Sequence, residues 1–308
     1  MSSLQQITRR KTGKTFVYLY LNKQITDVNT LERIRKLHIP PNWVNINIST
    51  KDTDYLQVTG LDAKKRTQYI YHPVWVELSK IEKYERMVLF TKKVDTIIKK
   101  INSILSKSMD LNSKEYIMAL LFRILFMTHS RIGNDHYAEE NNTYGLTTLL
   151  KRHVSVNGCQ VVLSYIGKKS VKQELKFKDI LSSKIIGELL KIPGSRLFKT
   201  KAGEHIRSID MNNYLKEITE SNVTAKDFRT YSSNNLFIKI ICSKPIPTTS
   251  AQIKRTINEC YDEVAEYLGH TRSISKSSYV MPIIAENYAE NPEEFVKSKP
   301  SILSILMV

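Results

Sequence analysis

The sequence predicts an α+β protein in which a small, mostly β N-terminal domain precedes a larger, mainly α-helical domain that contains a β-hairpin. Residues 1–72 hold short runs rich in β-branched and aromatic side chains, which is typical of strands. After Pro73 the apolar residues recur with a helical period. We place the boundary within a charged stretch, which gives domains of residues 1–78 and 79–308.

The N-terminal domain is predicted to contain four strands and one short helix. Turn residues separate the apolar runs, as in Pro40-Pro41 and Gly60-Leu61-Asp62. The expected strands are residues 16–21, 43–48, 55–58 and 68–71, and the expected helix is residues 31–37.

The C-terminal domain is predicted to begin with two helices, at residues 79–106 and 112–129. Two alternating runs then flank Asn157-Gly158, which is a strong hairpin signal. The remaining elements are a third run at residues 171–177, helices near Asp179, Asp210 and Thr224, and a long helix from about Ser250 to Tyr267.

The charge of the chain indicates a polyanionic partner. The 308 residues carry a formal net charge of +17, of which +7 falls in residues 1–80 and +10 in the rest, so a basic tail on a neutral body is excluded. Because 41% of the residues are hydrophobic, disorder does not explain the excess. Aromatic side chains alternate with basic ones in residues 64–72, which favours nucleic acid over a merely solvated basic face.

Several other classes of protein are disfavoured. The apolar stretch at residues 117–121 is too short for a membrane span, and the N-terminus lacks the apolar segment of a secretory signal. We therefore expect an intracellular, non-secreted protein. The three cysteines lie far apart, which argues against a zinc site, and no metal is expected. Thr12-Gly13-Lys14-Thr15 resembles the end of a phosphate-binding loop, but position 8, where that motif needs a glycine, is Thr8. No nucleotide cofactor is therefore expected.

Five residues fit one chemical task as a set, although each alone is more often structural. They are Arg131, Lys168, Arg229, His270 and Tyr279. A phosphodiester attacked by a phenolate gains negative charge on its non-bridging oxygens, which two guanidinium groups and an imidazole can bind. A tyrosine is then the nucleophile, and a lysine can protonate the departing oxygen.

These residues and their surroundings resemble the type IB DNA topoisomerases, specifically the compact poxvirus and mimivirus-like group. The resemblance covers nearly the whole chain. Its motifs are residues 62–72, Arg131 with Gly133 and Tyr137, Gly167-Lys168, residues 226–231, and residues 269–279, in which His270 and Tyr279 are nine positions apart.

The resemblance implies an enzyme that nicks one DNA strand and reseals it without ATP or metal. It implies that Tyr279 attacks and keeps the 3′ phosphate, while Arg131, Arg229 and His270 hold the phosphate oxygens. It further implies that Lys168, assisted by Arg131, protonates the 5′ oxygen. The fold would be of the tyrosine recombinase and topoisomerase IB type, forming a clamp around duplex DNA. The protein would act as a monomer on double-stranded DNA, with no membrane and no obligate protein partner.

The resemblance also implies a set of DNA contacts outside the five residues. Tyr69 and Tyr71 share one face of a strand, so both lie on DNA or both lie in the core; the adjacent basic residues favour DNA. The expected contacts are Lys64, Lys65, Arg66, Tyr69, Tyr71, Tyr137, Lys226, Asn234 and Ser273.

The chain departs from the poxvirus pattern at Asn134, Lys169 and Arg272, where a lysine, an acid and a proline are expected. The poxvirus preference for (C/T)CCTT therefore does not carry over to this chain without a test. A viral source would place the protein in the virion and in the host cytoplasm or viral factory.

Two other functions compete with this interpretation. Tyrosine recombinases and integrases share the His-to-Tyr spacing, but their second motif has His-x-x-Arg where this chain has Lys226-x-x-Arg229. Their N-terminal domain is a helical clamp, whereas residues 1–72 indicate strands. A non-catalytic basic DNA-binding protein, in which the five residues only contact phosphates, is the alternative from another class.

Overall fold

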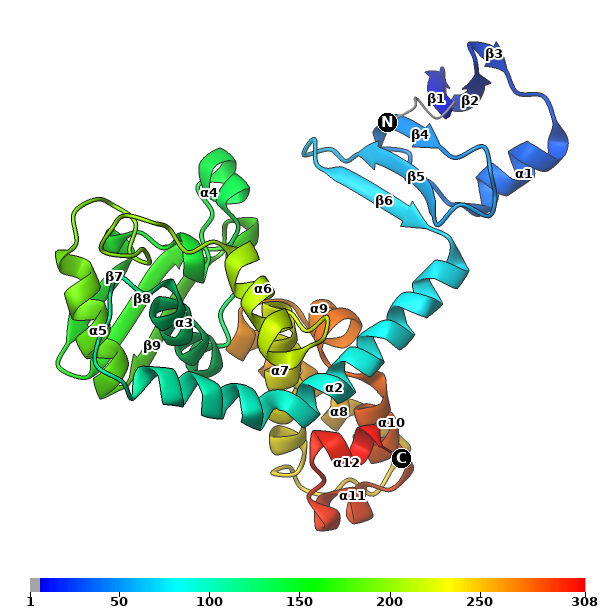
Figure 1. Cartoon of the computed structure of the whole chain (residues 1–308). Coiled ribbons are helices and arrows are strands. Elements are labelled where there is room, and N and C mark those ends of the chain that lie inside the picture. The colour runs from blue at the N-terminus through cyan, green and yellow to red at the C-terminus, as the bar shows by residue number, and fades with distance from the viewer. Residues whose placement is uncertain (1–5, 308) are drawn as a thin grey trace. The chain divides into compact units, whose positions relative to one another are not determined.

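The computed structural model describes residues 6–307 and divides the chain into two compact units, one up to Lys83 and one from Tyr84 (Figure 1). The division falls inside α2 (Pro73–Leu105), a continuous helix that supplies residues to both units. Within residues 6–307, no helix has both the length and the apolar character needed to cross a membrane. The predicted α+β class is confirmed.

The first unit is an antiparallel sheet of order β3-β2-β1-β4-β5-β6 with one helix. Its small core consists of Ile7, Ile34, Ile46, Ile48 and Val58. Its elements are β1 (Ile7–Thr12), β2 (Thr15–Tyr20), β3 (Lys23–Gln24), α1 (Val28–Lys36), β4 (Val44–Ile48), β5 (Leu56–Leu61) and β6 (Thr67–Tyr71). The four predicted strands correspond to β2, β4, β5 and β6, whereas β1 and the two-residue β3 were not predicted.

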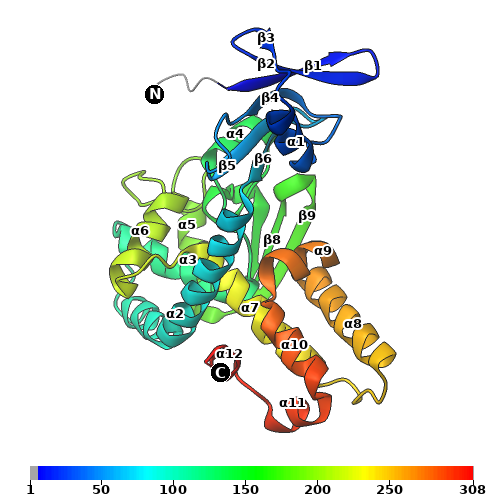
Figure 2. The same cartoon turned by 90° about the vertical axis from the view of Figure 1, so that its right-hand side faces the viewer.

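The second unit surrounds α3 (Lys114–Thr128), in which nine residues are buried. A helix that is apolar on every side is stable only when other elements cover it. The elements around it include α2, α5 (Ile180–Lys191), α6 (Ser208–Thr219) and α7 (Ala225–Ile241), shown in Figure 2. The part of α2 that belongs to this unit buries Phe90, Val94, Ile97 and Ile101 at helical spacing.

A three-stranded antiparallel sheet of order β7-β8-β9 packs beside α3 and α5. Its strands are β7 (Val154–Asn157), β8 (Gln160–Ile166) and β9 (Lys172–Lys178). Asn157 pairs with Gln160 across the predicted turn, where Gly158 adopts φ 57°. The loop between β8 and β9 carries Lys168 in the short helix η3 (Lys168–Ser170).

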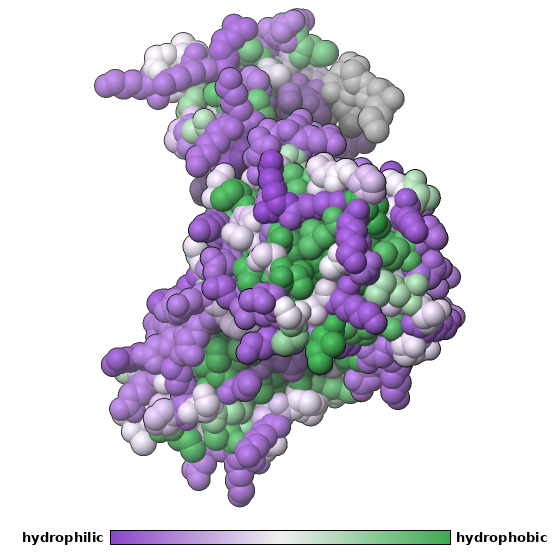
Figure 3. All heavy atoms as spheres, turned by 90° about the vertical axis from the view of Figure 1, so that its left-hand side faces the viewer, coloured by the Kyte–Doolittle hydropathy of each residue, from purple (hydrophilic) through white to green (hydrophobic). Residues whose placement is uncertain are grey.

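The C-terminal part of this unit forms a second cluster of buried apolar residues around α7 and α8 (Ser250–Leu268). The elements that follow are α9 (Arg272–Ile274), the π-helical turn η4 (Ser275–Tyr279), α10 (Pro282–Glu290), α11 (Pro292–Ser298) and α12 (Ile302–Leu306). The smaller elements between α3 and β7 are α4 (Asp135–Asn141), η1 (Leu146–Thr148) and η2 (Lys151–His153). On the face seen in Figure 3, hydrophilic side chains cover most of the surface.

Candidate active site

Arg229 lies on α7 and is buried, with only 4% of its surface exposed. Its guanidinium donates hydrogen bonds to the carbonyl oxygens of His129, at 2.6 Å, and Leu268. Its Nη2 nitrogen lies 3.2 Å from Nδ1 of His270, and its Nε–H has no hydrogen-bond partner among the described residues. Burial and then the nearby charge of Arg131 lower the pKa of Arg229 to about 10, while Tyr279 opposes this shift.

His270 and Tyr279 stack on each other beside Arg229. Their ring centroids are 4.9 Å apart with an interplanar angle of 26°, and the guanidinium carbon of Arg229 lies 5.3 Å from the Tyr279 ring centroid. Burial, then Arg229 and Arg131, lower the pKa of His270 to about 4. The imidazole is therefore neutral at neutral pH, and these three predicted site residues come together.

The chain reaches these positions through two unusual backbone features. Gly269 ends α8 at φ 62°, a left-handed conformation that favours glycine, and places His270 directly after the helix. Tyr279 closes the π-helical turn η4, in which the N–H of Val280 donates to the carbonyl of Ser275 at 2.9 Å. π-helical turns are rare in proteins, and those that occur are frequently found at functional sites.

Arg131 lies in the segment between α3 and α4 and is close enough to Arg229 and His270 for its charge to lower the pKa of both. Its own carbonyl accepts from the N–H of Leu146 at 2.8 Å. The same segment passes so near Gly145 that a Cβ there would lie 2.4 Å from Cα of Gly133. Only a residue without a side chain fits at Gly145, and this close approach fixes the segment that carries Arg131.

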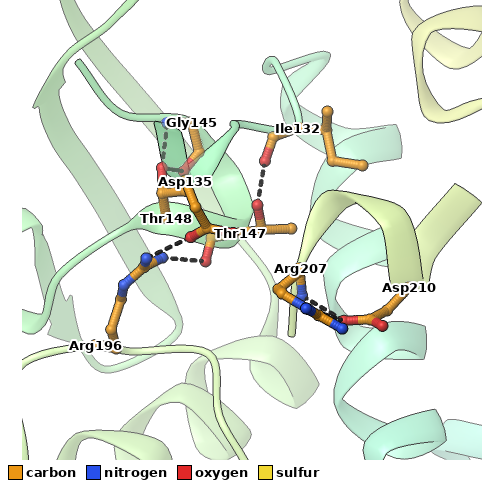
Figure 4. Close-up of polar contacts among 8 residues, drawn as sticks. All are labelled: Ile132, Asp135, Gly145, Thr147, Thr148, Arg196, Arg207 and Asp210. Atoms are coloured by element: carbon orange, nitrogen blue, oxygen red, sulfur yellow. Dashed lines mark hydrogen bonds and ion pairs between the residues drawn. The ribbon is translucent and has the colours of Figure 1, made fainter. Parts of the chain in front are cut away.

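Further polar contacts hold this segment in place (Figure 4). The Thr147 hydroxyl donates to the carbonyl oxygen of Ile132 at 2.9 Å, and Arg196 forms an ion pair with Asp135 at the start of α4. Arg196 also donates to the carbonyl of Thr147 at 3.4 Å. The segment that contains Arg131 is thus hydrogen-bonded to other segments of the same unit.

Lys168 is exposed in the β8–β9 loop. Among the residues that the structure describes, it forms no hydrogen bond or ion pair with the other four predicted site residues. The structure thus brings Arg229, His270 and Tyr279 into contact and Arg131 into electrostatic range, whereas the exposed Lys168 side chain is bonded to none of them.

Asn234 corrects the sequence prediction. It was predicted to contact DNA, but its side chain has no exposed surface. Its Nδ2 donates to the carbonyl of Thr230 at 2.7 Å and to that of Tyr279 at 3.2 Å, and its Oδ1 accepts from the N–H of Met281 at 2.8 Å. Asn234 therefore anchors the backbone of Tyr279, and its burial argues against the predicted contact with DNA.

The other predicted DNA contacts are exposed. Tyr69 and Tyr71 are 51% and 39% exposed and stack with centroids 6.1 Å apart, so neither belongs to the core. Lys64, Lys65, Tyr137, Lys226 and Ser273 also face solvent. Arg66 is exposed as well, but its guanidinium binds Asp62 at 2.5 and 2.8 Å, and this lowers the pKa of the Asp62 carboxyl to about 2.

Sequence reasoning missed Ser275 and His129. Ser275 is buried and its Oγ lies 2.9 Å from Nε2 of His270. His129 offers its carbonyl to Arg229, and burial and then Arg229 lower its pKa to about 4. The sequence offered one signal for each residue. Ser275 lies five positions after His270, and His129 lies two positions before Arg131.

Comparisons with known proteins identify the family of the chain. The family "Eukaryotic DNA topoisomerase I, catalytic core" matches residues 75–302, and the family "Bacterial DNA topoisomerase IB, N-terminal domain" matches residues 15–62. DNA topoisomerase 1B of Acanthamoeba polyphaga mimivirus is 31% identical over 96% of this chain and 91% of the relative. DNA topoisomerase 1B of Vaccinia virus (strain Copenhagen) is 27% identical over 90% of this chain and 88% of the relative.

A structural comparison gives a weaker likeness. The XerH site-specific recombinase bound to its difH substrate aligns at a TM-score of 0.36 and 15% identity. The alignment covers 76% of this chain and 60% of that chain.

Fold, site and family matches together define a DNA-cleaving and resealing enzyme of the tyrosine class. The chain belongs to the type IB DNA topoisomerase family, as the sequence predicted. DNA binding follows from that membership.

Proposed function

We propose that this chain relaxes supercoiled double-stranded DNA through a 3′-phosphotyrosyl intermediate at Tyr279. The observation that carries the proposal is the contact of Tyr279 with both His270 and Arg229, a phenol beside the two kinds of donor that bind phosphate oxygens. The family to which the chain belongs supports the same reaction.

The reaction balances without a cofactor. The Tyr279 hydroxyl loses its proton to water as its oxygen forms a bond to the scissile phosphorus, while the bond to the 5′ oxygen breaks. Arg131, Arg229 and His270 stabilise the charge on the non-bridging oxygens, and Lys168 gives a proton to the 5′ oxygen. The phosphotyrosine conserves the energy of the broken ester, so after the DNA swivels the 5′ hydroxyl attacks and displaces Tyr279 without ATP.

The two units then have separate roles. The N-terminal unit contacts DNA through Lys64, Lys65, Tyr69 and Tyr71, and the C-terminal domain cleaves it, with both acting as a clamp on one duplex. The protein works as a monomer. The viral source of the relatives favours a virus-encoded, intracellular protein.

Relaxation of a supercoiled plasmid tests the proposal. The plasmid lacks paired recombination sites, and the buffer contains EDTA and no ATP. We expect the wild type to relax it and to leave an SDS-resistant DNA adduct, and Tyr279→Phe to do neither. Relaxation by Tyr279→Phe would assign the nucleophile elsewhere, and no relaxation or adduct by the wild type would favour a DNA-binding protein without catalysis. Relaxation only of plasmids with paired sites would favour a recombinase.

A further inference from the structure

Two glycines that directly precede predicted catalytic residues contact the same side chain. Gly167 precedes Lys168, and Gly269 precedes His270. A Cβ built on Gly167 would lie 2.9 Å from Cγ of Gln173, and one built on Gly269 would lie 3.1 Å from both Nε2 and Oε1 of Gln173. The stem of Gln173 therefore packs on the lysine loop, and its amide packs on the histidine segment.

Gln173 is well placed to hold these two segments at a fixed distance. It lies on β9, opposite Tyr165 of β8, and is half-buried. Tyr165 is itself buried, and the charges of Arg229 and Arg131 act on its hydroxyl. The end of the β8–β9 hairpin that adjoins the Lys168 loop is thus part of the surroundings of the two arginines.

The tip of the hairpin lacks such support. The N–H of Gly167 donates to the carbonyl of Val171 at 2.8 Å and closes the loop, while Lys169 and Ser170 adopt φ values of 64° and 59°. Lys168 itself is exposed. The position of its ammonium group relative to His270 therefore depends on the base of the loop, where Gln173 lies.

We propose that Gln173 is a positioning residue that sets the Lys168 loop against the His270 segment, so that the lysine reaches the departing 5′ oxygen. This inference rests on the proposed function of Lys168 as the general acid. Because a small misplacement of a catalytic group costs up to two orders of magnitude in rate, loss of the Gln173 side chain should slow the step that needs Lys168.

Single-turnover cleavage of two DNA substrates tests this role. One is ordinary DNA, and the other carries a 5′-bridging phosphorothiolate, whose sulfur leaves without a proton. We expect Gln173→Ala to cleave ordinary DNA about tenfold more slowly than the wild type and phosphorothiolate DNA within about twofold of it. Normal cleavage of the second substrate also shows that the variant is folded.

Two comparisons complete the experiment. Glu174→Gln is the matched control, because Glu174 is the exposed neighbour of Gln173 and its side chain forms an ion pair with Lys176, at 2.5 Å. It should match the wild type on both substrates. The double variant Lys168→Ala/Gln173→Ala should be no slower on ordinary DNA than Lys168→Ala alone, because no acid is left to position.

Different outcomes would overturn the positioning role of Gln173 and the general-acid role of Lys168 on which it rests. The role of Gln173 would be overturned if Gln173→Ala slowed cleavage of both substrates equally or of neither. It would also be overturned if the effects of the two changes multiplied in the double variant. Failure of phosphorothiolate to rescue Lys168→Ala would instead overturn the general-acid role of Lys168.

Discussion

Nε2 of His270 lies 2.9 Å from Oγ of Ser275, on the ring edge opposite the contact between Nδ1 and Arg229. A guanidinium can only donate, so Nδ1 accepts and the imidazole proton is on Nε2. That proton is donated to Ser275. Because His270 has only this one donor in its neutral form, a phosphate oxygen must replace the Ser275 hydroxyl before His270 can stabilise charge on it.

Stability should fall in acid because of His270 and His129. Both have a pKa of about 4 in the folded chain against about 6.5 when exposed, so the unfolded chain binds more protons between these values. The stability present above pH 6.5 is therefore lost as the pH falls toward 4. We expect the melting temperature to decrease over this range, and His129→Gln to flatten the decrease. An unchanged slope in that variant would contradict the buried, neutral state of His129.

Asn234→Ala should weaken folding and cleavage but not DNA binding. The variant removes the bonds to Tyr279 and Met281, so we expect the free energy of unfolding to fall by about 2–3 kcal/mol and cleavage to slow. Lys226→Ala is the matched control on the same helix: its side chain is exposed, so it should lose DNA affinity and keep its stability. Urea unfolding and equilibrium DNA binding measure both. A loss of affinity without a loss of stability in Asn234→Ala would restore the predicted role of Asn234 on DNA.

Gly145→Ala should be strongly destabilising. Its Cβ would lie 2.4 Å from backbone atoms of Gly133 and 2.8 Å from the carbonyl oxygen of Arg131, and backbone cannot move aside as a flexible side chain can. We expect a loss of about 2–3 kcal/mol in the free energy of unfolding, together with impaired cleavage. Gly187→Ala, within α5 and with open space around it, should be neutral or gain up to about 1 kcal/mol. Equal effects of the two changes would show that the close approach is not a constraint.

Replacing Lys64 and Lys65 should reduce the salt dependence of DNA binding. For each phosphate that is no longer neutralised by a lysine, the slope of log affinity against log salt should become shallower by about 0.9. Arg66→Ala should leave the slope nearly unchanged, because the Arg66 guanidinium is already paired with Asp62. Binding titrations from low to high salt measure the slopes. A larger change for Arg66 than for the two lysines would mean that the ion pair opens on DNA.

Sequence patterns were sufficient where the signal is local. Alternation located four strands of the first unit, and Asn157-Gly158 located the β7–β8 turn. Strand β1 was missed because five of its six residues, Thr8 to Thr12, are polar or charged. Its Arg9 is held by the carbonyls of Pro40 and Trp43, an interaction over more than thirty positions that no local pattern contains.

The residues that meet at the candidate site could be predicted from sequence motifs, but the interactions that support them could not. The motifs named Arg229, His270 and Tyr279, which are in contact, because the reaction dictates their chemical types. They could not reveal that Asn234 points into the core or that Gln173 touches both Gly167 and Gly269. Those relations depend on which side of a helix or strand faces a neighbour from a distant part of the chain.

The burial of Arg229 has a consequence for engineering. Among the residues that the structure describes, no carboxylate pairs with this guanidinium, and Arg131 adds a second positive charge nearby. A buried cation without a counterion is costly for a fold. Stability-driven redesign would therefore favour an apolar side chain at this position, and under the proposed mechanism the resulting protein would be more stable but inactive. A sequence keeps the destabilising Arg229 only where DNA cleavage itself is under selection.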